Sequence, residues 1–208
     1  PSRRRQKGKR SSVRLFIVFT VLIFACLVVI GFINVKVSSQ LLRKPSHAAP
    51  LTFVDIQTDV RGNLGPPTAL LSNGTDWLKD RWQAASDMHG TAIKGAHWVA
   101  LELDRPAHVT KVVLDWETAY SEDYSLVAIV GESYEVPLLD TRREKPTKVA
   151  ESGLSPGVPK LKLPLHIVHT WELPSIKVRD YKKYKLLIRS PFHQSWGVSL
   201  WRVELTGY

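Results

Sequence analysis

Few residues of this 208-residue chain stand in a pattern that predicts catalysis. The sequence contains no Gly-x-Ser-x-Gly elbow, no phosphate-binding glycine loop and no His-Glu-x-x-His zinc motif. Cys26 is the only cysteine and lies in an apolar segment, so the rest of the chain can form neither a disulfide nor a cysteine-based metal site. His166 and His169 stand three positions apart in a stretch that reads as a strand, which points them to opposite faces. We therefore predict that the protein is not an enzyme.

The polar stretch 72–80 offers binding and modification chemistry instead. Trp77 lies there beside Gly74 with no alternating pattern around it, and an exposed loop tryptophan gives a flat apolar surface on which a sugar ring can stack. Asn73-Gly74-Thr75 is an N-x-Thr sequon. We predict Trp77 as a stacking residue and Asn73 as a candidate glycosylation site.

An uncharged apolar segment at residues 15–35 follows a strongly basic start. At about 1.5 Å per residue, a helix of this length spans about 30 Å, the thickness of the hydrocarbon core of a bilayer. Seven Lys or Arg residues precede the segment and fewer follow it closely. Because such residues stay on the cytoplasmic side, we predict a signal anchor with a cytoplasmic N-terminus. The rest of the chain is then extracytoplasmic, at the cell surface or in the secretory pathway.

Two other interpretations of this segment stay open. A cleaved secretory signal peptide also begins with basic residues, but its apolar core is usually about 7–15 residues long. The nearest small-residue cleavage candidate, residues 46–49, lies well past the end of the apolar segment. An Arg-rich start without acidic residues also suits the end of an organelle transit peptide, which would place the protein in an organelle inner membrane.

Charge and composition divide the chain into four parts. Residues 1–14 form a basic cytoplasmic tail, residues 15–35 a transmembrane helix, residues 36–51 a linker, and residues 52–208 one domain. Seven of the positive charges behind the formal net charge of +10 lie in the tail, so nothing in the domain indicates binding to nucleic acid. Beside a membrane segment, the tail fits contact with anionic lipid headgroups.

The predicted domain carries the pattern of β-strands. Residues 97–103 alternate, with Val99, Leu101 and Leu103 on one face. Further stretches rich in β-branched and aromatic residues lie at 109–117, 123–131, 165–173, 183–190 and 196–207. Residues 132–164 contain several prolines and predict either a long excursion or a pair of irregular edge strands. Short strands at this spacing predict an all-β antiparallel sandwich or barrel.

Five motifs occur in the order in which one known family has them. They are Asn73-Gly74, Arg81-Trp82, the stretch from Trp98 to Leu103, the stretch from Val112 to Tyr124, and the stretch from Trp196 to Gly207. The domain thus resembles the discoidin family, which comprises the C-type domains of coagulation factors five and eight and the galactose-binding-like carbohydrate-binding modules. The resemblance implies a jelly-roll β-sandwich of about eight strands. It also implies that Glu117 belongs to the framework, in a structural role.

Many discoidin domains hold a structural calcium ion between an Asp-Gly loop and a glutamate of the last strand. The resemblance places Asn73 and Glu204 at the matching positions, with carbonyl oxygens of the loop completing the shell. Asn73 replaces the usual aspartate, which lowers the charge of the site, and Asp76 and Asp80 lie nearby as alternative ligands. Calcium is therefore the one cofactor that we expect.

The family binds its ligands through loops at one end of the sandwich. Its sugar-binding members use an aromatic ring with a few His, Arg, Lys or Asn side chains. The resemblance implies six candidate ligand residues, in the early loops and in the loop 190–196: Trp77, His89, Lys94, His193, Gln194 and Trp196. Phospholipid-binding members expose adjacent large apolar residues, and these loops lack that pattern.

Together these features predict a non-catalytic single-pass membrane protein whose outer domain binds a glycan or a protein partner, as in carbohydrate binding or cell adhesion. The alternative is a structural accessory subunit of a larger membrane protein complex, with no ligand of its own. The expected partners are the lipid bilayer and either a glycan or the protein subunits of such a complex.

Overall fold

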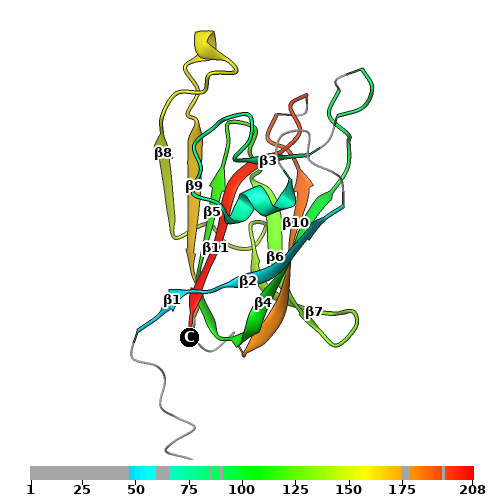
Figure 1. Cartoon of the computed structure of the whole chain (residues 1–208), viewed down its shortest axis with the longest axis vertical. Helices are drawn as coiled ribbons and strands as arrows, with labels where there is room; N and C mark the ends of the chain where they lie inside the picture. Colours follow the sequence, from blue (N-terminus) through cyan, green and yellow to red (C-terminus); the bar gives the residue numbers. More distant parts are fainter. Residues whose placement is uncertain (1–46, 60–65, 85, 90, 175–178, 194) are drawn as a thin grey trace, which may run out of the picture. The chain divides into compact units, whose positions relative to one another are not determined.

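Two antiparallel sheets face each other and enclose the core of the domain (Figure 1). The computed structural model describes residues 47–59, 66–84, 86–89, 91–174, 179–193 and 195–208. The predicted tail and transmembrane helix, and most of the predicted linker, lie outside these residues. Within the described part of the chain, no helix is long and apolar enough to cross a membrane.

Sheet A has the strand order β1-β11-β5-β9-β8, and β3 pairs with the start of β11. Its strands are β1 (Ala49–Pro50), β3 (Trp82–Gln83), β5 (Val109–Trp116), β8 (Lys148–Ser152), β9 (His166–Glu172) and β11 (Ser199–Gly207). Sheet B has the order β2-β4-β10-β6-β7. Its strands are β2 (Phe53–Thr58), β4 (His97–Ala107), β6 (Asp123–Val130), β7 (Tyr134–Asp140) and β10 (Tyr181–Ser190). Two short 3-10 helices, η1 (Pro67–Leu71) and η2 (Pro159–Leu161), lie in the loops.

The prediction of an all-β antiparallel sandwich is confirmed. In β4 the side chains of Val99, Leu101 and Leu103 are buried, as their alternation predicts. The proline-rich stretch 132–164 contains a pair of edge strands, since β7 ends sheet B and β8 ends sheet A. The sandwich also takes in the last residues of the predicted linker, because β1 pairs with the end of β11.

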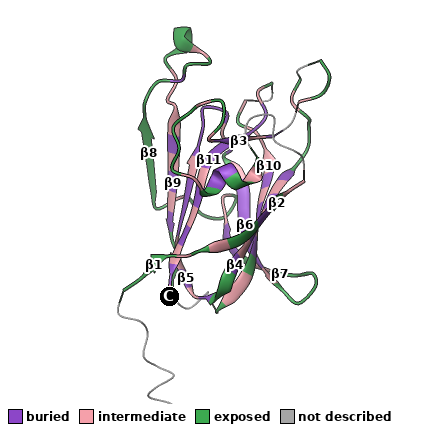
Figure 2. Ribbon diagram, viewed as in Figure 1, coloured by how far each residue is buried: buried purple, intermediate pink, exposed green. Residues whose placement is uncertain are grey.

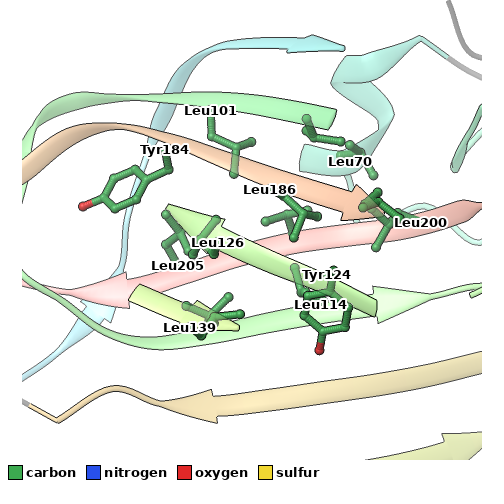
Figure 3. Close-up of a cluster of buried hydrophobic side chains, with 14 of the residues drawn as sticks. Leu70, Leu101, Leu114, Tyr124, Leu126, Leu139, Tyr184, Leu186, Leu200 and Leu205 are labelled. Carbon is green, nitrogen blue, oxygen red and sulfur yellow. The ribbon is translucent and has the colours of Figure 1, made fainter. Parts of the chain in front are cut away.

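The core lies between the two sheets and consists of aliphatic and aromatic side chains from both (Figure 3). Leu114 of β5 and Leu205 of β11 face Leu126 of β6 and Leu186 of β10, and all four are fully buried. Figure 2 shows buried residues along the inner strands and exposed residues along β8. At roughly 25 cal/mol per Å² of apolar surface, a core of this kind stabilises the domain without a disulfide.

Most tryptophans serve packing. Trp82, Trp116 and Trp171 belong to the core. Trp201 is also buried and donates its indole N–H to the carbonyl oxygen of Leu165, 3.1 Å away. Since a tryptophan buries roughly 150–250 Å², these residues account for a large part of the hydrophobic stabilisation.

The two ends of the sandwich differ. β1 pairs with Thr206 and Gly207 at the end of β11, so the start of the described chain and the C-terminus lie at one end (Figure 1). The loops before β3, between β3 and β4, and between β10 and β11 gather at the other end. At about 3.3 Å per residue, β11 separates the two ends by roughly 30 Å.

Candidate functional site

A pocket of about 260 Å³ opens at the loop end of the sandwich. Four segments far apart in the sequence build it: the stretch around β3, the residues after β5, the loop between β8 and β9, and the loop before β11. The side chains and backbone that line it belong to Trp77, Arg81, Gln83, Ser86, Ala92, Glu117, Thr118, Ala119, Ser155, Gly157, Val158, Ser195 and Trp196. We call it the tryptophan pocket, after Trp77 and Trp196.

A buried ion pair lies at the base of the tryptophan pocket. Arg81 precedes β3 and Glu117 follows β5, and each stands next to a tryptophan that points into the core. Both side chains are buried, and Arg81 Nη1 lies 3.7 Å from Glu117 Oε2. Burial lowers the pKa of the Arg81 guanidinium, and the charge of Glu117 counteracts this shift. Because a buried charge is costly without a partner, the two residues depend on each other.

This ion pair also fixes Trp77. The indole N–H of Trp77 donates to Glu117 Oε1 at 3.2 Å, and the Arg81 guanidinium lies 4.2 Å from the centre of the Trp77 ring. Arg81 Nε in turn donates to the Trp77 carbonyl oxygen at 2.7 Å. Gly157 closes the edge of the ring, since a Cβ there would lie 3.0 Å from Trp77 Cζ2. Trp77 is therefore half-buried and held in place, whereas the sequence predicts an exposed loop residue.

Trp196 also lines the pocket and is supported by its own loop. Its ring centre lies 4.2 Å from that of His193, which in turn lies 4.9 Å from that of Phe192. Gly197 follows with a φ of +72°, a conformation that favours glycine and turns the chain into β11. The loop therefore presents Trp196 to the pocket with aromatic support behind it.

The structure brings some of the predicted ligand residues together and leaves others apart. Trp77 and Trp196 line the same pocket, and His193 contacts Trp196. His89 and Lys94 are exposed in the loop between β3 and β4 and do not line the pocket, although Ser86 and Ala92 of that loop do. Gln194 lies outside the described residues.

The tryptophan pocket presents no net charge. Among the described residues that line it, Arg81 and Glu117 alone are charged, and they face each other. The remaining polar side chains are neutral: Gln83, Ser86, Thr118, Ser155 and Ser195. Such a lining can exchange hydrogen bonds with hydroxyl groups while the indole rings cover apolar faces.

Several lining residues were missed by the sequence analysis. Ser155, Gly157 and Val158 come from the proline-rich excursion, which is folded back onto Trp77. Thr118 holds this loop by donating to the carbonyl oxygen of Pro164 at 2.7 Å. Nothing in the local sequence shows this approach, because it depends on contacts between residues about 80 positions apart.

Asn73 and Glu204, the two predicted calcium ligands, both lie near Arg202. Arg202 Nη1 donates to Asn73 Oδ1 at 2.9 Å and lies 3.8 Å from Glu204 Oε2. The side chain of Arg202 thus holds a positive charge between them, and the arrangement does not fit a calcium shell. Among the described residues, no group of three or more His, Cys, Asp or Glu side chains could hold a metal ion. Calcium binding at this site is untested, and with Arg202 between the two predicted ligands we expect no calcium ion there.

Asn73 is exposed, and only its Oδ1 accepts the hydrogen bond from Arg202. Glycosylation attaches a sugar to the amide nitrogen, so this contact is compatible with a glycan at the sequon. His166 and His169 lie on opposite faces of β9, as predicted: His169 is buried against Tyr124, whereas His166 pairs with Asp115 at 3.1 Å on the outer face.

No protein-family model matches the chain, and no curated protein sequence matches it. Solved structures do match. A variant of chitosan-binding module 1, from a chitosanase/glucanase of Paenibacillus sp. IK-5, gives a TM-score of 0.52 at 15% identity, over 77% of this chain and 100% of that chain. XRCC1, bound to the catalytic domain of DNA polymerase β, gives 0.50 at 13% identity, over 77% and 99%. The family 32 carbohydrate-binding module of Streptococcus pneumoniae EndoD gives 0.49 at 11% identity, over 77% and 100%.

At such low identity the first two matches show a shared fold. The predicted galactose-binding-like sandwich is therefore confirmed as a fold. What the domain binds must therefore be argued from its own features, which are the tryptophan pocket and the ion pair of Arg81 and Glu117 at its base.

Proposed function

We propose that the domain is a non-catalytic glycan-binding domain that receives a neutral sugar in the tryptophan pocket. The observation that carries the proposal is the composition of this pocket: Trp77 and Trp196 in one lining, neutral hydrogen-bonding side chains in the same lining, and charges that compensate each other. Sugar rings have apolar faces and hydroxyl edges, which match these two kinds of surface.

Size and rigidity support this assignment. At about 260 Å³ the pocket is slightly smaller than the pockets that enclose drug-sized ligands, which begin at about 300 Å³, so it suits one sugar residue. Trp77 is fixed by Glu117 and Arg81 before a ligand arrives, which lowers the entropy cost of binding. A protein with the same fold is named as a chitosan-binding module, so this fold supports sugar binding elsewhere.

We further propose that residues 15–35 anchor this domain in a membrane, with the N-terminus in the cytoplasm. The described chain enters the sandwich at β1, beside the end of β11, whereas the tryptophan pocket lies beside the start of β11. A tether that enters at β1 would therefore leave the pocket at the far end of the domain, roughly 30 Å from the entry point. This arrangement suits display of a binding site to soluble or opposing partners.

One observation favours the accessory-subunit alternative. β8 is an edge strand of sheet A, and all five of its residues are exposed. An exposed edge strand can pair with a strand of another protein. Purification of the full chain from mild detergent distinguishes the two functions, because stoichiometric co-purifying subunits would favour the accessory role.

A glycan array tests the proposed function directly. The full chain in mild detergent should bind neutral glycans. Sulfated glycans and glycans with uronic acids should bind no more tightly than neutral ones, because the only cation among the described residues of the pocket lining, Arg81, is paired with Glu117. Replacement of Trp196 by Ala should remove the signal, whereas replacement of the exposed Lys94 by Ala should leave it unchanged. Binding that depends on Lys94 and not on Trp196 would refute the assignment of the pocket.

A further inference from the structure

A second cavity, of about 160 Å³, lies on the inner side of β8 and β9. All five residues of β8 are exposed, so sheet B does not cover this edge of sheet A (Figure 2). Tyr120 and the loop between β7 and β8 close the space instead. We call it the edge cavity.

The edge cavity contains a histidine, His169, whose tautomer is fixed by hydrogen bonds in the core. His169 lines the cavity and is 5% exposed. Trp171 donates its indole N–H to Tyr124 Oη at 3.0 Å, and Tyr124 Oη lies 2.8 Å from His169 Nδ1. An indole N–H can only donate, so the phenol accepts from Trp171, and its own proton has no other hydrogen-bond partner among the described residues than Nδ1, to which we infer that it donates. His169 therefore carries its proton on Nε2.

Burial keeps this imidazole neutral. Desolvation lowers the pKa of His169 to about 4, so the ring is uncharged at neutral pH. With Nδ1 turned to Tyr124, Nε2–H is the donor that remains for a molecule in the edge cavity. The cavity thus offers one neutral N–H donor of fixed tautomer.

The surroundings of this donor are partly apolar and partly charged, and the acidic Glu122 and Glu151 and the basic Lys145 line the cavity. Val149 of β8 is directly opposite His169 in the strand register, and Glu151 is opposite Ile167, so these side chains share one face of the sheet. Val149 and Ile167 give apolar surface next to the N–H donor, and Glu151 gives an acceptor. A donor, an apolar patch and an acceptor in one cavity match a secondary amide that carries a methyl group.

We propose that the edge cavity binds the acetamido group of an N-acetylated amino sugar. The carbonyl oxygen accepts from His169 Nε2–H, the methyl group lies against Val149 and Ile167, and the amide N–H is directed to Glu151. At about 160 Å³ the cavity admits a substituent and not a whole glycan chain.

This inference rests on the proposed glycan-binding function and narrows its ligand class. Ala119 lines the tryptophan pocket and the next residue, Tyr120, lines the edge cavity. The two sites therefore adjoin one short segment, and we expect an oligosaccharide seated in the first to extend into the second. The ligand is then a neutral oligosaccharide that contains N-acetylated residues.

The test compares two trisaccharides with the same linkage, the β-1,4 trimer of N-acetylglucosamine and cellotriose, by calorimetric titration of the full chain in mild detergent. One additional buried hydrogen bond predicts that the N-acetylated trimer binds about fivefold to tenfold more tightly. Val149→Phe fills the edge cavity from an exposed position and should abolish this preference while retaining cellotriose binding. Lys148→Ala, at the neighbouring position of β8, is the matched control and should retain the preference for the N-acetylated trimer.

A second variant tests the fixed tautomer without filling the cavity. Tyr124→Phe retains the ring and removes the hydroxyl group that fixes His169, so the preference for the N-acetylated trimer should fall. Nitrogen NMR of the histidines should show His169 protonated at Nε2 in the unaltered chain and a mixture of tautomers in Tyr124→Phe.

The outcomes separate this inference from the proposed function. Equal binding of both trimers, or a preference that survives Val149→Phe, overturns the acetamido site and leaves the tryptophan pocket as a sugar site. A His169 protonated at Nδ1 also overturns it. Binding of neither trimer overturns the acetamido site, and the glycan array then decides the proposed function separately.

Discussion

Replacement of Glu117 by Gln tests whether the ion pair of Arg81 and Glu117 stabilises the tryptophan pocket. The substitution retains the size of the side chain and removes the charge that faces Arg81 at 3.7 Å, and its single amide oxygen cannot accept from both Trp77 Nε1 and the Ala119 backbone N–H. At an effective dielectric constant of about 20, two unit charges at this distance attract by about 4 kcal/mol. Arg81 would keep only neutral partners, the Trp77 carbonyl oxygen and the Ser199 hydroxyl. Breaking a buried pair in this way typically costs about 3–5 kcal/mol, so we expect a loss of that size in the free energy of unfolding.

Urea unfolding followed by tryptophan fluorescence measures this loss. The double variant with Arg81→Met and Glu117→Gln is the control, because it leaves no unpaired charge and should be less destabilised than the sum of the single variants. Sugar affinity should fall in both, since Glu117→Gln weakens the hydrogen bond at the Trp77 indole N–H and the double variant also removes the guanidinium above the Trp77 ring. A loss of less than about 1 kcal/mol in the free energy of unfolding for Glu117→Gln would refute the argument that this ion pair stabilises the pocket. Strict additivity of the two substitutions in the double variant would refute it as well.

Three further predictions follow from other parts of the chain. Burial lowers the pKa of His169 from 6.5 to about 4, so the neutral ring costs the folded state nothing above pH 6.5, and stability falls as the pH drops toward 4. The free energy of unfolding should therefore fall by about 2–3 kcal/mol more between pH 7 and pH 4.5 in the unaltered chain than in His169→Asn. An equal fall in both proteins would contradict this. Because Arg202 holds a positive charge between Asn73 and Glu204, the melting temperature should be the same in calcium and in chelator, and a rise in calcium would show that the ion displaces Arg202. Neutralising the basic residues of the tail 1–14 should weaken or invert insertion, which protease protection in sealed vesicles measures; unchanged protection would argue against the predicted orientation.

The strands of the sandwich were predictable because their signal is local. The alternation in β4 predicts which face is buried, the β-branched residues of β5 predict a strand, and the structure agrees with both. β1 and β3 have two residues each, and neither carries a periodic pattern, so the sequence gives no sign of them. Their pairing follows from β11, which provides a free edge at one end and backbone partners for β3 at the other.

The candidate site was predictable only in part, for a physical reason. The types of Trp77 and Trp196 indicate aromatic stacking, and the fold brings them to one pocket. The fixed position of Trp77, however, depends on Glu117, which is 40 positions away, and on a glycine in the excursion between β8 and β9. The hydrogen bond from Arg202 to Asn73 joins residues 129 positions apart. Such contacts depend on how loops pack, and residue type and spacing do not determine this.

The most direct test of the central claim is a calorimetric titration of the full chain with a neutral oligosaccharide selected on the array, set against three tryptophan variants. Trp77→Ala and Trp196→Ala should each weaken binding at least tenfold, about 1.4 kcal/mol, because both rings line the pocket. Trp98→Ala is the control, since Trp98 is half-buried in β4, outside the pocket lining, and should leave the affinity unchanged. Equal affinity in all three variants, or a loss in Trp98→Ala alone, would contradict the account.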